Sequence, residues 1–185
     1  MLSASTAGRV TPLAEHRGGH DDGSVPVVFY GDYTRPASRA AFAALKQVES
    51  LADGDVTVVH RHLVSDPGSW AHRLAEAAEA AATLGSFLAM HDGLYVRSPR
   101  SEEEVLAVAT TAGLDVATFE ARWRRPDGSS AVLAQHDALA GLDRVRHAPT
   151  VLLGGAPSSS PTDPKVLWAE VRSAIGHTWV RTGAA

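Results

Sequence analysis

The stretch Val25-Pro26-Val27-Val28-Phe29-Tyr30 decides the fold of this chain, because a short run of β-branched and aromatic residues is typical of a buried strand. Residues 37–51 follow with apolar side chains at helical spacing, and residues 56–62 then alternate as a second strand. A strand, a helix and a strand in this order favour parallel pairing of the two strands through a right-handed crossover. The opening of the chain therefore predicts an α/β fold.

A long helical block follows this unit, at about residues 68–143. Alanine and glutamate are abundant in it, Ser101 and Glu104 form a capping box, and glycines stand where helices are expected to end. Helices are predicted within residues 70–84, 87–95, 101–112, 115–123 and 129–142. The chain then returns to a strand at 150–153, and Asp163 with Pro164 begins a last helix.

These elements form one predicted domain over residues 25–176, with the helical block as an insertion. Residues 1–24 lack periodicity and are predicted to be a mobile tail, and residues 177–185 are predicted to be a C-terminal tail. No apolar run has the length of a signal peptide or a membrane span, so we expect a cytoplasmic protein without membrane association. The predicted core surrounds the sheet and consists of Val27, Phe29, Phe42, Leu45, Val58, Val151 and Leu153.

The composition excludes several kinds of function. The chain has 185 residues and no cysteine, which removes disulfides, thiolate metal sites and cysteine nucleophiles. Its formal net charge of −4 argues against general nucleic-acid binding, which needs a basic surface. Neither a Gly-x-Ser-x-Gly elbow nor a glycine-rich phosphate-binding motif is present, so hydrolase and nucleotide-binding functions have no motif behind them.

Four segments stand in an order and spacing that point to a known family. They are His60-Arg61-His62 at the end of the second strand, residues 71–80, Met90-His91-Asp92 and Gly113-Leu114-Asp115. Together they resemble the DsbA-like family, which has a thioredoxin fold with a helical insertion. The resemblance covers roughly residues 25–176 and implies that fold here.

The resemblance also locates a degenerate redox motif. Asp32-Tyr33-Thr34-Arg35-Pro36-Ala37-Ser38 aligns with the family's Asp-Tyr-x-Cys-Pro-x-Cys, so that Arg35 and Ser38 replace the two cysteines. Thiol–disulfide exchange requires an attacking thiolate, and neither replacement can supply one. The positions of the former redox motif are Arg35, Pro36, Ala37 and Ser38.

A second functional position follows from the same resemblance. Pro149 before Thr150 resembles the cis-proline that faces the redox motif in thioredoxin folds. The backbone beside that proline presents itself to extended peptides in the manner of strand addition. The loop expected to take this part is His147, Ala148, Pro149 and Thr150.

Two functions remain compatible with these residues. The first is a redox-inactive DsbA-like protein that binds a peptide or protein partner or forms a homodimer, without a cofactor. The second resembles the kappa-class glutathione transferases, in which a loop serine binds the glutathione sulfur. It would be a transferase or isomerase that takes glutathione, another small thiol or an anion at Arg35 and Ser38, beside a positive helix end.

Several histidines were weighed as metal ligands. His60 and His62 share one face of a predicted strand, and such pairs can bind metal, but strands of relatives often end in a basic pair. His72 and His91 lie on separate predicted helices and are interpreted as packing or surface residues. The tail holds a further cluster without the spacing of a known site: Glu15, His16, His20, Asp21 and Asp22. We therefore predict no metal site.

Overall fold

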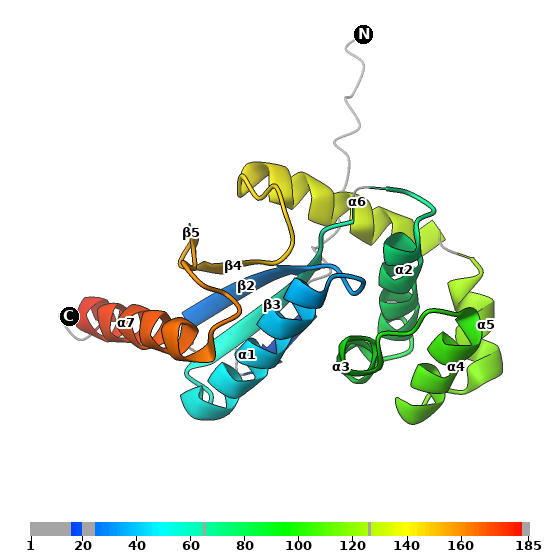
Figure 1. Cartoon of the computed structure of the whole chain (residues 1–185), viewed down its shortest axis with the longest axis horizontal. Coiled ribbons are helices and arrows are strands. Elements are labelled where there is room, and N and C mark those ends of the chain that lie inside the picture. Colours follow the sequence, from blue (N-terminus) through cyan, green and yellow to red (C-terminus); the bar gives the residue numbers. More distant parts are fainter. Residues whose placement is uncertain (1–15, 20–24, 65, 126, 183–185) are drawn as a thin grey trace, which may run out of the picture.

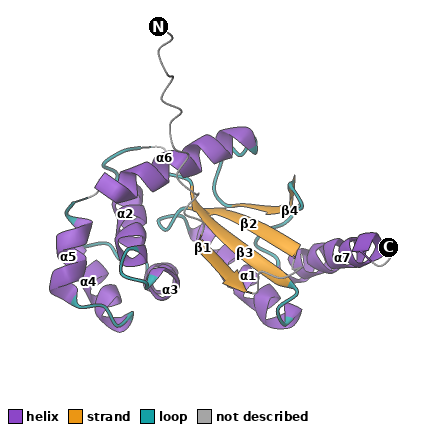
Figure 2. Ribbon diagram, turned by 180° about the vertical axis from the view of Figure 1, so that it is seen from behind, coloured by secondary structure: helices purple, strands orange, loops and turns teal. Residues whose placement is uncertain are grey.

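A five-stranded mixed sheet forms the centre of the molecule, as the computed structural model shows (Figure 1). The structure describes residues 16–19, 25–64, 66–125 and 127–182. The strands are β1 (His16–Gly19), β2 (Val25–Gly31), β3 (Val56–His62), β4 (Thr150–Leu153) and β5 (Ala156–Pro157). Their order across the sheet is β1-β3-β2-β4-β5, and Figure 2 shows β1 to β4 side by side from behind.

The predicted strand–helix–strand unit is confirmed. β2 and β3 pair in parallel, with Val25 beside Val56 and Gly31 beside His62, and the remaining strand pairs are antiparallel. Helix α1 (Pro36–Ala52) makes the crossover between them. It begins at proline, whose fixed φ suits the first helical position, and the chain leaves it through Asp53 in the left-handed region. This unit places the end of β2 and the start of α1 together.

Helices α1 and α7 (Pro164–Thr182) cover one face of the sheet with apolar side chains. The opposite face carries Tyr30 and Leu152, which pack on the end of α6 (Asp127–Leu142) and the residues after it. The Tyr30 hydroxyl donates to the Asp143 carboxylate over 2.6 Å, and Arg61 donates to the Tyr30 oxygen over 2.8 Å. The sheet is therefore covered on both faces, as the α/β prediction requires.

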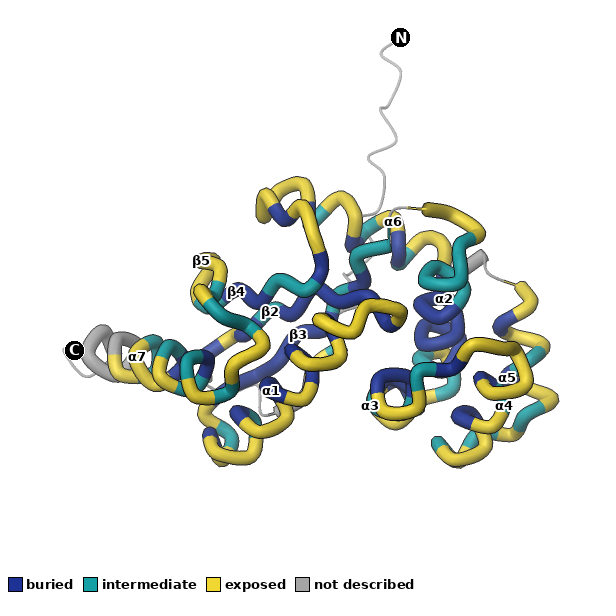
Figure 3. The backbone as a smooth tube through the Cα atoms, viewed as in Figure 1, coloured by how far each residue is buried: buried dark blue, intermediate teal, exposed yellow. Residues whose placement is uncertain are grey.

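The helical insertion is confirmed between β3 and β4. Its helices are α2 (Trp70–Ala82), α3 (Phe87–Arg97), α4 (Glu102–Thr111), α5 (Val116–Trp123) and α6. Figure 3 shows α2 as the buried centre of this group, and every residue from Leu74 to Ala81 is buried. The small alanine side chains let α3, α5 and α6 approach α2 closely.

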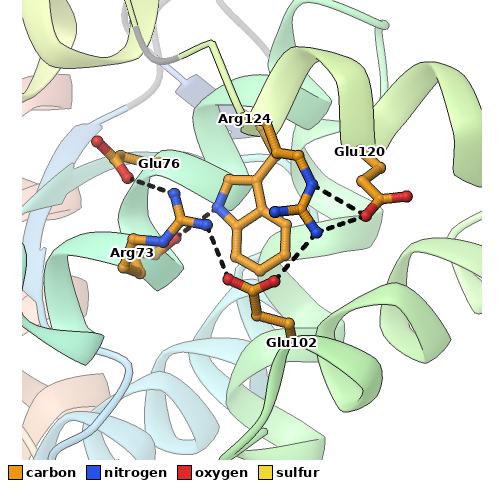
Figure 4. A network of polar contacts seen from close by, with 6 residues as sticks. Arg73, Glu76, Glu102, Glu120 and Arg124 are labelled. Atoms are coloured by element: carbon orange, nitrogen blue, oxygen red, sulfur yellow. Dashed lines mark hydrogen bonds and ion pairs between the residues drawn. The ribbon is translucent and has the colours of Figure 1, made fainter.

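A polar network ties three insertion helices together (Figure 4). The Glu102 carboxylate at the start of α4 accepts hydrogen bonds from Arg73 of α2 and from Arg124 at the end of α5. The Arg73 guanidinium also lies over the Trp123 ring, 4.5 Å from its centroid, and the Trp123 indole donates to the Arg73 carbonyl. The outer end of the insertion is thus stabilised independently of the sheet.

Two boundaries and one core residue differ from the prediction. Residues 16–19 belong to β1 and not to a mobile tail, because they pair with β3. The local sequence His-Arg-Gly-Gly does not predict this tertiary contact. The rest of residues 1–24 lies outside the described residues. Helix α7 continues to Thr182, beyond the expected end at 176. Of the predicted core, Leu153 is half-buried, because β4 has Leu152 buried on the opposite face and lies next to the short strand β5.

Candidate functional site

The 32–38 loop begins where β2 ends and is organised by Asp32. One oxygen of its carboxylate accepts the Thr34 backbone N–H over 2.8 Å and the Thr34 hydroxyl over 2.7 Å. The Asp32 carbonyl accepts the Arg35 N–H over 3.2 Å. An aspartate that closes a turn in this way delivers the chain into α1 at Pro36. The aligned motif positions therefore form a hydrogen-bonded turn that leads directly into α1.

Arg35 occupies the position of the attacking cysteine and lies at the surface. Its side chain is 58% exposed, and its Nε lies 3.3 Å from the second oxygen of Asp32. An ion pair at this exposure contributes less than about 1 kcal/mol to stability, since water screens it. The guanidinium is a surface cation beside a carboxylate, with no nucleophilic atom.

Ser38 occupies the position of the second cysteine and is completely buried. Its hydroxyl accepts the backbone N–H of Asp32 over 3.3 Å. The alternative function, a thiol or anion pocket at Arg35 and Ser38, requires this hydroxyl to be accessible. The structure encloses it, because Ser38 lies on the face of α1 that packs into the core.

The proline loop, residues 147–150, lies next to the motif loop, residues 32–38. Thr150 of β4 pairs with Tyr30 of β2 in antiparallel register, so Pro149 comes beside the end of β2 where the motif loop starts. The Ala148–Pro149 peptide bond is cis, as the resemblance implies. His147 is exposed and Ala148 is buried, while the Thr150 hydroxyl donates to the His147 carbonyl over 2.8 Å.

Tyr33 connects the motif loop to the interior. It is buried, and burial raises the pKa of its phenol well above the usual value. The phenol therefore keeps its proton and donates to His91 Nδ1 over 2.7 Å. Tyr95 packs beside Tyr33, and its hydroxyl lies so close to Gly31 that a side chain at that position would clash. The motif loop thus rests on a tightly packed aromatic layer.

Behind this layer lies a buried set of imidazoles around one carboxylate, here termed the histidine cluster. Two strands and three insertion helices supply it, so it joins the sheet to the insertion. Its members are His16, His60, His62, Glu79, His91 and His136.

The strands bring three of these histidines to one face. His60 and His62 are two residues apart on β3, and His16 of β1 is paired with His60. Phe87 at the start of α3 stacks on His16, with ring centroids 3.4 Å apart. His91, one turn further along α3, lies with its ring centroid 4.2 Å from that of His60.

Glu79 of α2 is the carboxylate of the cluster and is 3% exposed. Its Oε1 lies 2.9 Å from His62 Nε2 and 2.9 Å from His16 Nε2. Burial alone would raise the pKa of Glu79, but the hydrogen bonds from His16 and His62 lower it to about 2. The carboxylate is therefore ionised in the interior.

Three of the imidazoles are held in the neutral form. Burial lowers the pKa of His60 to about 3 and that of His136 to about 3, and it lowers the pKa of His91 well below its usual value. Each of the three rings also has one buried nitrogen without a hydrogen-bond partner among the described residues. Such atoms are rare in folded proteins.

Sequence reasoning thus found part of this cluster. The sequence offers His60, His62 and His91 as candidate ligands but predicts no metal site. The structure brings all three together. His72 stays apart, at the first turn of α2, 3.5 Å from Glu76. Glu79, His16 and His136 were missed as members of one site, because they are distant in sequence and no short motif joins them. The other members of the tail cluster lie outside the described residues.

Known proteins resemble this chain in both sequence and fold. The sequence profile of the family described as Thioredoxin matches residues 12–172. A thioredoxin-like oxidoreductase from Silicibacter pomeroyi is 28% identical, with a TM-score of 0.75 over 89% of this chain and 93% of that one. The thiol-disulfide exchange protein alpha-DsbA2 from Wolbachia pipientis shares the fold, with a TM-score of 0.76 at 21% identity over 88% of each chain.

Curated relatives come from another class of protein. The chain is 32% identical over 175 residues to Na(+)/H(+) antiporter NhaA 3 of Salinispora tropica and 31% identical to NhaA 1 of Salinispora arenicola. The match covers 93% of this chain and 26% of each antiporter, so the chain spans about a quarter of their length. Within the described residues, no helix is both long enough and apolar enough to span a membrane. By the family profile and the fold, the chain belongs to the thioredoxin family in its DsbA-like form, and it lacks both cysteines of the redox motif.

Proposed function

We propose that this chain is a non-catalytic binding module, which uses the surface between the motif loop and the proline loop to hold an extended segment of a partner protein. The observation that carries the proposal is that Arg35 and Ser38 stand at the aligned positions of both sulfurs, in a loop that Asp32 closes into a turn before α1. Without a thiolate the exchange reaction has no first step. The surface that would orient a substrate remains.

Three further features support a binding role. The exposed side chains of Arg35 and His147 belong to the two adjoining loops, and both can contact a bound chain. Strand addition beside the proline would use backbone groups and so needs no particular partner sequence. The matching segment of the curated relatives is a quarter of a longer protein, which favours an accessory module over a free-standing oxidoreductase.

The first experiment measures reduction of insulin by dithiothreitol and oxidative refolding of a reduced disulfide protein. The wild-type chain should not exceed the blank in either assay. A variant with both Arg35→Cys and Ser38→Cys should regain activity, because the turn, the helix start and the proline loop are in place. Turnover by the wild type would overturn the proposal, and an inert double variant would show that the loop geometry is not that of a redox motif.

The second experiment tests binding itself. The ¹⁵N-labelled chain is titrated with reduced and carboxamidomethylated insulin B chain as an extended probe. Amide shifts should concentrate at Arg35 and at residues 147–150, and residues of the outer insertion such as Arg97 should not shift. Shifts confined to other surfaces, or none at millimolar probe, would contradict a binding role for these loops.

A thiol-cofactor transferase or isomerase is the second candidate, and the exposed Arg35 guanidinium is the observation that favours it. Because Ser38 is enclosed, the anion would be held by Arg35 and backbone groups. Calorimetry with glutathione should then give heat that Arg35→Ala removes and Arg124→Ala leaves intact. Absence of heat at millimolar glutathione would exclude this function.

A further inference from the structure

We propose that His62, Glu79 and His136 form a binding site for one divalent cation of the zinc type, with His16 beside them as a fourth donor. Within the described residues, this is the group in which three or more metal-binding side chains bring their ligand atoms within 4.8 Å of one another. The proposal departs from the sequence analysis, which predicted no metal site. It is independent of the binding role proposed for the loops.

The first support is geometric. His62 Nε2 and His16 Nε2 each lie 2.9 Å from Glu79 Oε1, so two imidazole nitrogens already converge on one carboxylate oxygen. The donors of a tetrahedral zinc ion, each about 2.0–2.1 Å from the metal, stand about 3.3 Å apart. The two spacings of 2.9 Å therefore need an expansion of only a few tenths of an ångström, and the ligand atoms of His62, Glu79 and His136 all lie within 4.8 Å of one another. The side chains come from β1, β3, α2 and α6, elements whose positions the whole fold determines.

The second support is the burial of Glu79. This carboxylate is 3% exposed, and within the described residues its side-chain partners are two imidazole nitrogens. A buried anion is stabilised best by a full positive charge at close range. A divalent cation would supply that charge within the ligand set.

The third support is His136, which is 1% exposed. Its Nδ1 accepts the backbone N–H of His62 over 3.1 Å, which places the ring proton on Nε2. Nε2 is buried and has no partner among the described residues, an arrangement that costs about 1–3 kcal/mol. His136 therefore brings to the cluster one nitrogen, Nε2, to which no described residue forms a hydrogen bond.

The donor set points to the class of ion. Neutral imidazoles with one carboxylate suit zinc and its neighbours cobalt, nickel and copper, whereas magnesium and calcium prefer oxygen ligands. The set of two or three histidines and one carboxylate is a zinc-type set.

Binding exchanges hydrogen bonds for metal bonds. The ion takes the place of the hydrogens between Glu79 and the Nε2 atoms of His16 and His62, and each displaced proton moves to Nδ1 of its ring or leaves to solvent. His136 binds through Nε2 after its ring proton has moved to Nδ1, and it then gives up its hydrogen bond to the His62 backbone. Because the donors belong to the sheet and to the insertion, a bound ion would clamp these two parts together and stabilise the folded state.

The experiment loads the chelator-treated full chain with Zn²⁺ in calorimetry and with Co²⁺ in absorption spectroscopy. We expect one tight equivalent, visible d–d bands of a four- or five-coordinate N/O site, and a melting temperature that rises with Zn²⁺ concentration. His62→Gln, Glu79→Gln and His136→Gln should each weaken this equivalent by roughly 100-fold or more. The matched control His72→Gln alters the histidine of the outer His72–Glu76 pair and should leave affinity unchanged.

A measurement on the wild type guards against variants that fail to fold. Imidazole ¹⁵N resonances recorded during the Zn²⁺ titration should change for His62 and His136 and stay constant for His72 and His147. No tight equivalent in the folded wild type, or an equivalent whose resonances belong to His72 or His147, would overturn the site.

Discussion

The motif loop and the histidine cluster are in contact through Tyr33 of the loop, and they accommodate charge in opposite ways. In the loop, Arg35 pairs with Asp32 at the surface, where water screens both charges. In the cluster, the ionised Glu79 is enclosed by imidazoles with little access to water. The motif loop lacks the two sulfur atoms that thiol–disulfide exchange requires. The histidine cluster brings together ionisable side chains that no sequence motif predicts. Sequence alignment identifies the motif loop, whereas only the packing of the fold identifies the histidine cluster.

Acid should produce the largest effect, and it should act through the cluster. The pKa values of His60 and His136 are about 3 in the folded chain against 6.5 unfolded, so the unfolded state binds more protons between these values. Their stabilisation is complete above pH 6.5 and is lost as the pH falls, by about 1.4 kcal/mol per pH unit for each ring.

Glu79 extends the same loss to lower pH. Its pKa is about 2 folded against 4.5 unfolded, so its contribution is present above pH 4.5 and disappears as the pH falls toward 2. Urea unfolding with chelator at pH 7, 6, 5, 4 and 3 measures the decline. A free energy of unfolding that stays constant from pH 7 to 5 would show that the rings are not held neutral.

Phe42→Ala tests the support that both regions share. Phe42 lies on α1, which starts in the loop, and its ring stacks on Tyr95 and meets His91 edge-on. Removing this buried ring should lower the free energy of unfolding by about 3–5 kcal/mol. Chemical denaturation measures it, and near-wild-type stability would contradict the packing of α1 on the cluster.

Glu79→Ala tests the cluster alone. The substitution leaves His16 and His62 buried without their acceptor, and breaking a buried pair of this kind costs about 3–5 kcal/mol. The measurement is urea unfolding at pH 7 in chelator. A loss below about 1 kcal/mol would place Glu79 in the class of surface pairs and remove the contrast with the loop.

Arg35→Ala should have the smallest effect. The ion pair with Asp32 is exposed, so its loss should change the free energy of unfolding by less than about 1 kcal/mol. The same denaturation series measures it, with Glu79→Ala for comparison. A decrease in the free energy of unfolding as large as that of Glu79→Ala would show that Arg35 stabilises the fold more than an exposed ion pair can.

Local sequence signals predicted most of the fold. The run at residues 25–30, the capping box at Ser101 and the Asp163-Pro164 start all correspond to observed elements, since each signal acts through neighbouring residues. β1 was missed because its pairing with β3, not its own residues, makes it a strand. The burial of Ser38 was not predicted, because an aligned motif gives a position in the sequence and not the depth at which α1 buries it.

The sequence by itself determined that the chain is α/β, that a helical block interrupts it, and that thiol chemistry is absent, because periodicity and residue type are local properties. Only the tertiary structure decided that His16, His62, Glu79 and His136 meet. Their separation along the chain is bridged by the β1–β3 pairing and by the packing of α2 and α6 against β3, and contacts of that range depend on the folding of the whole chain.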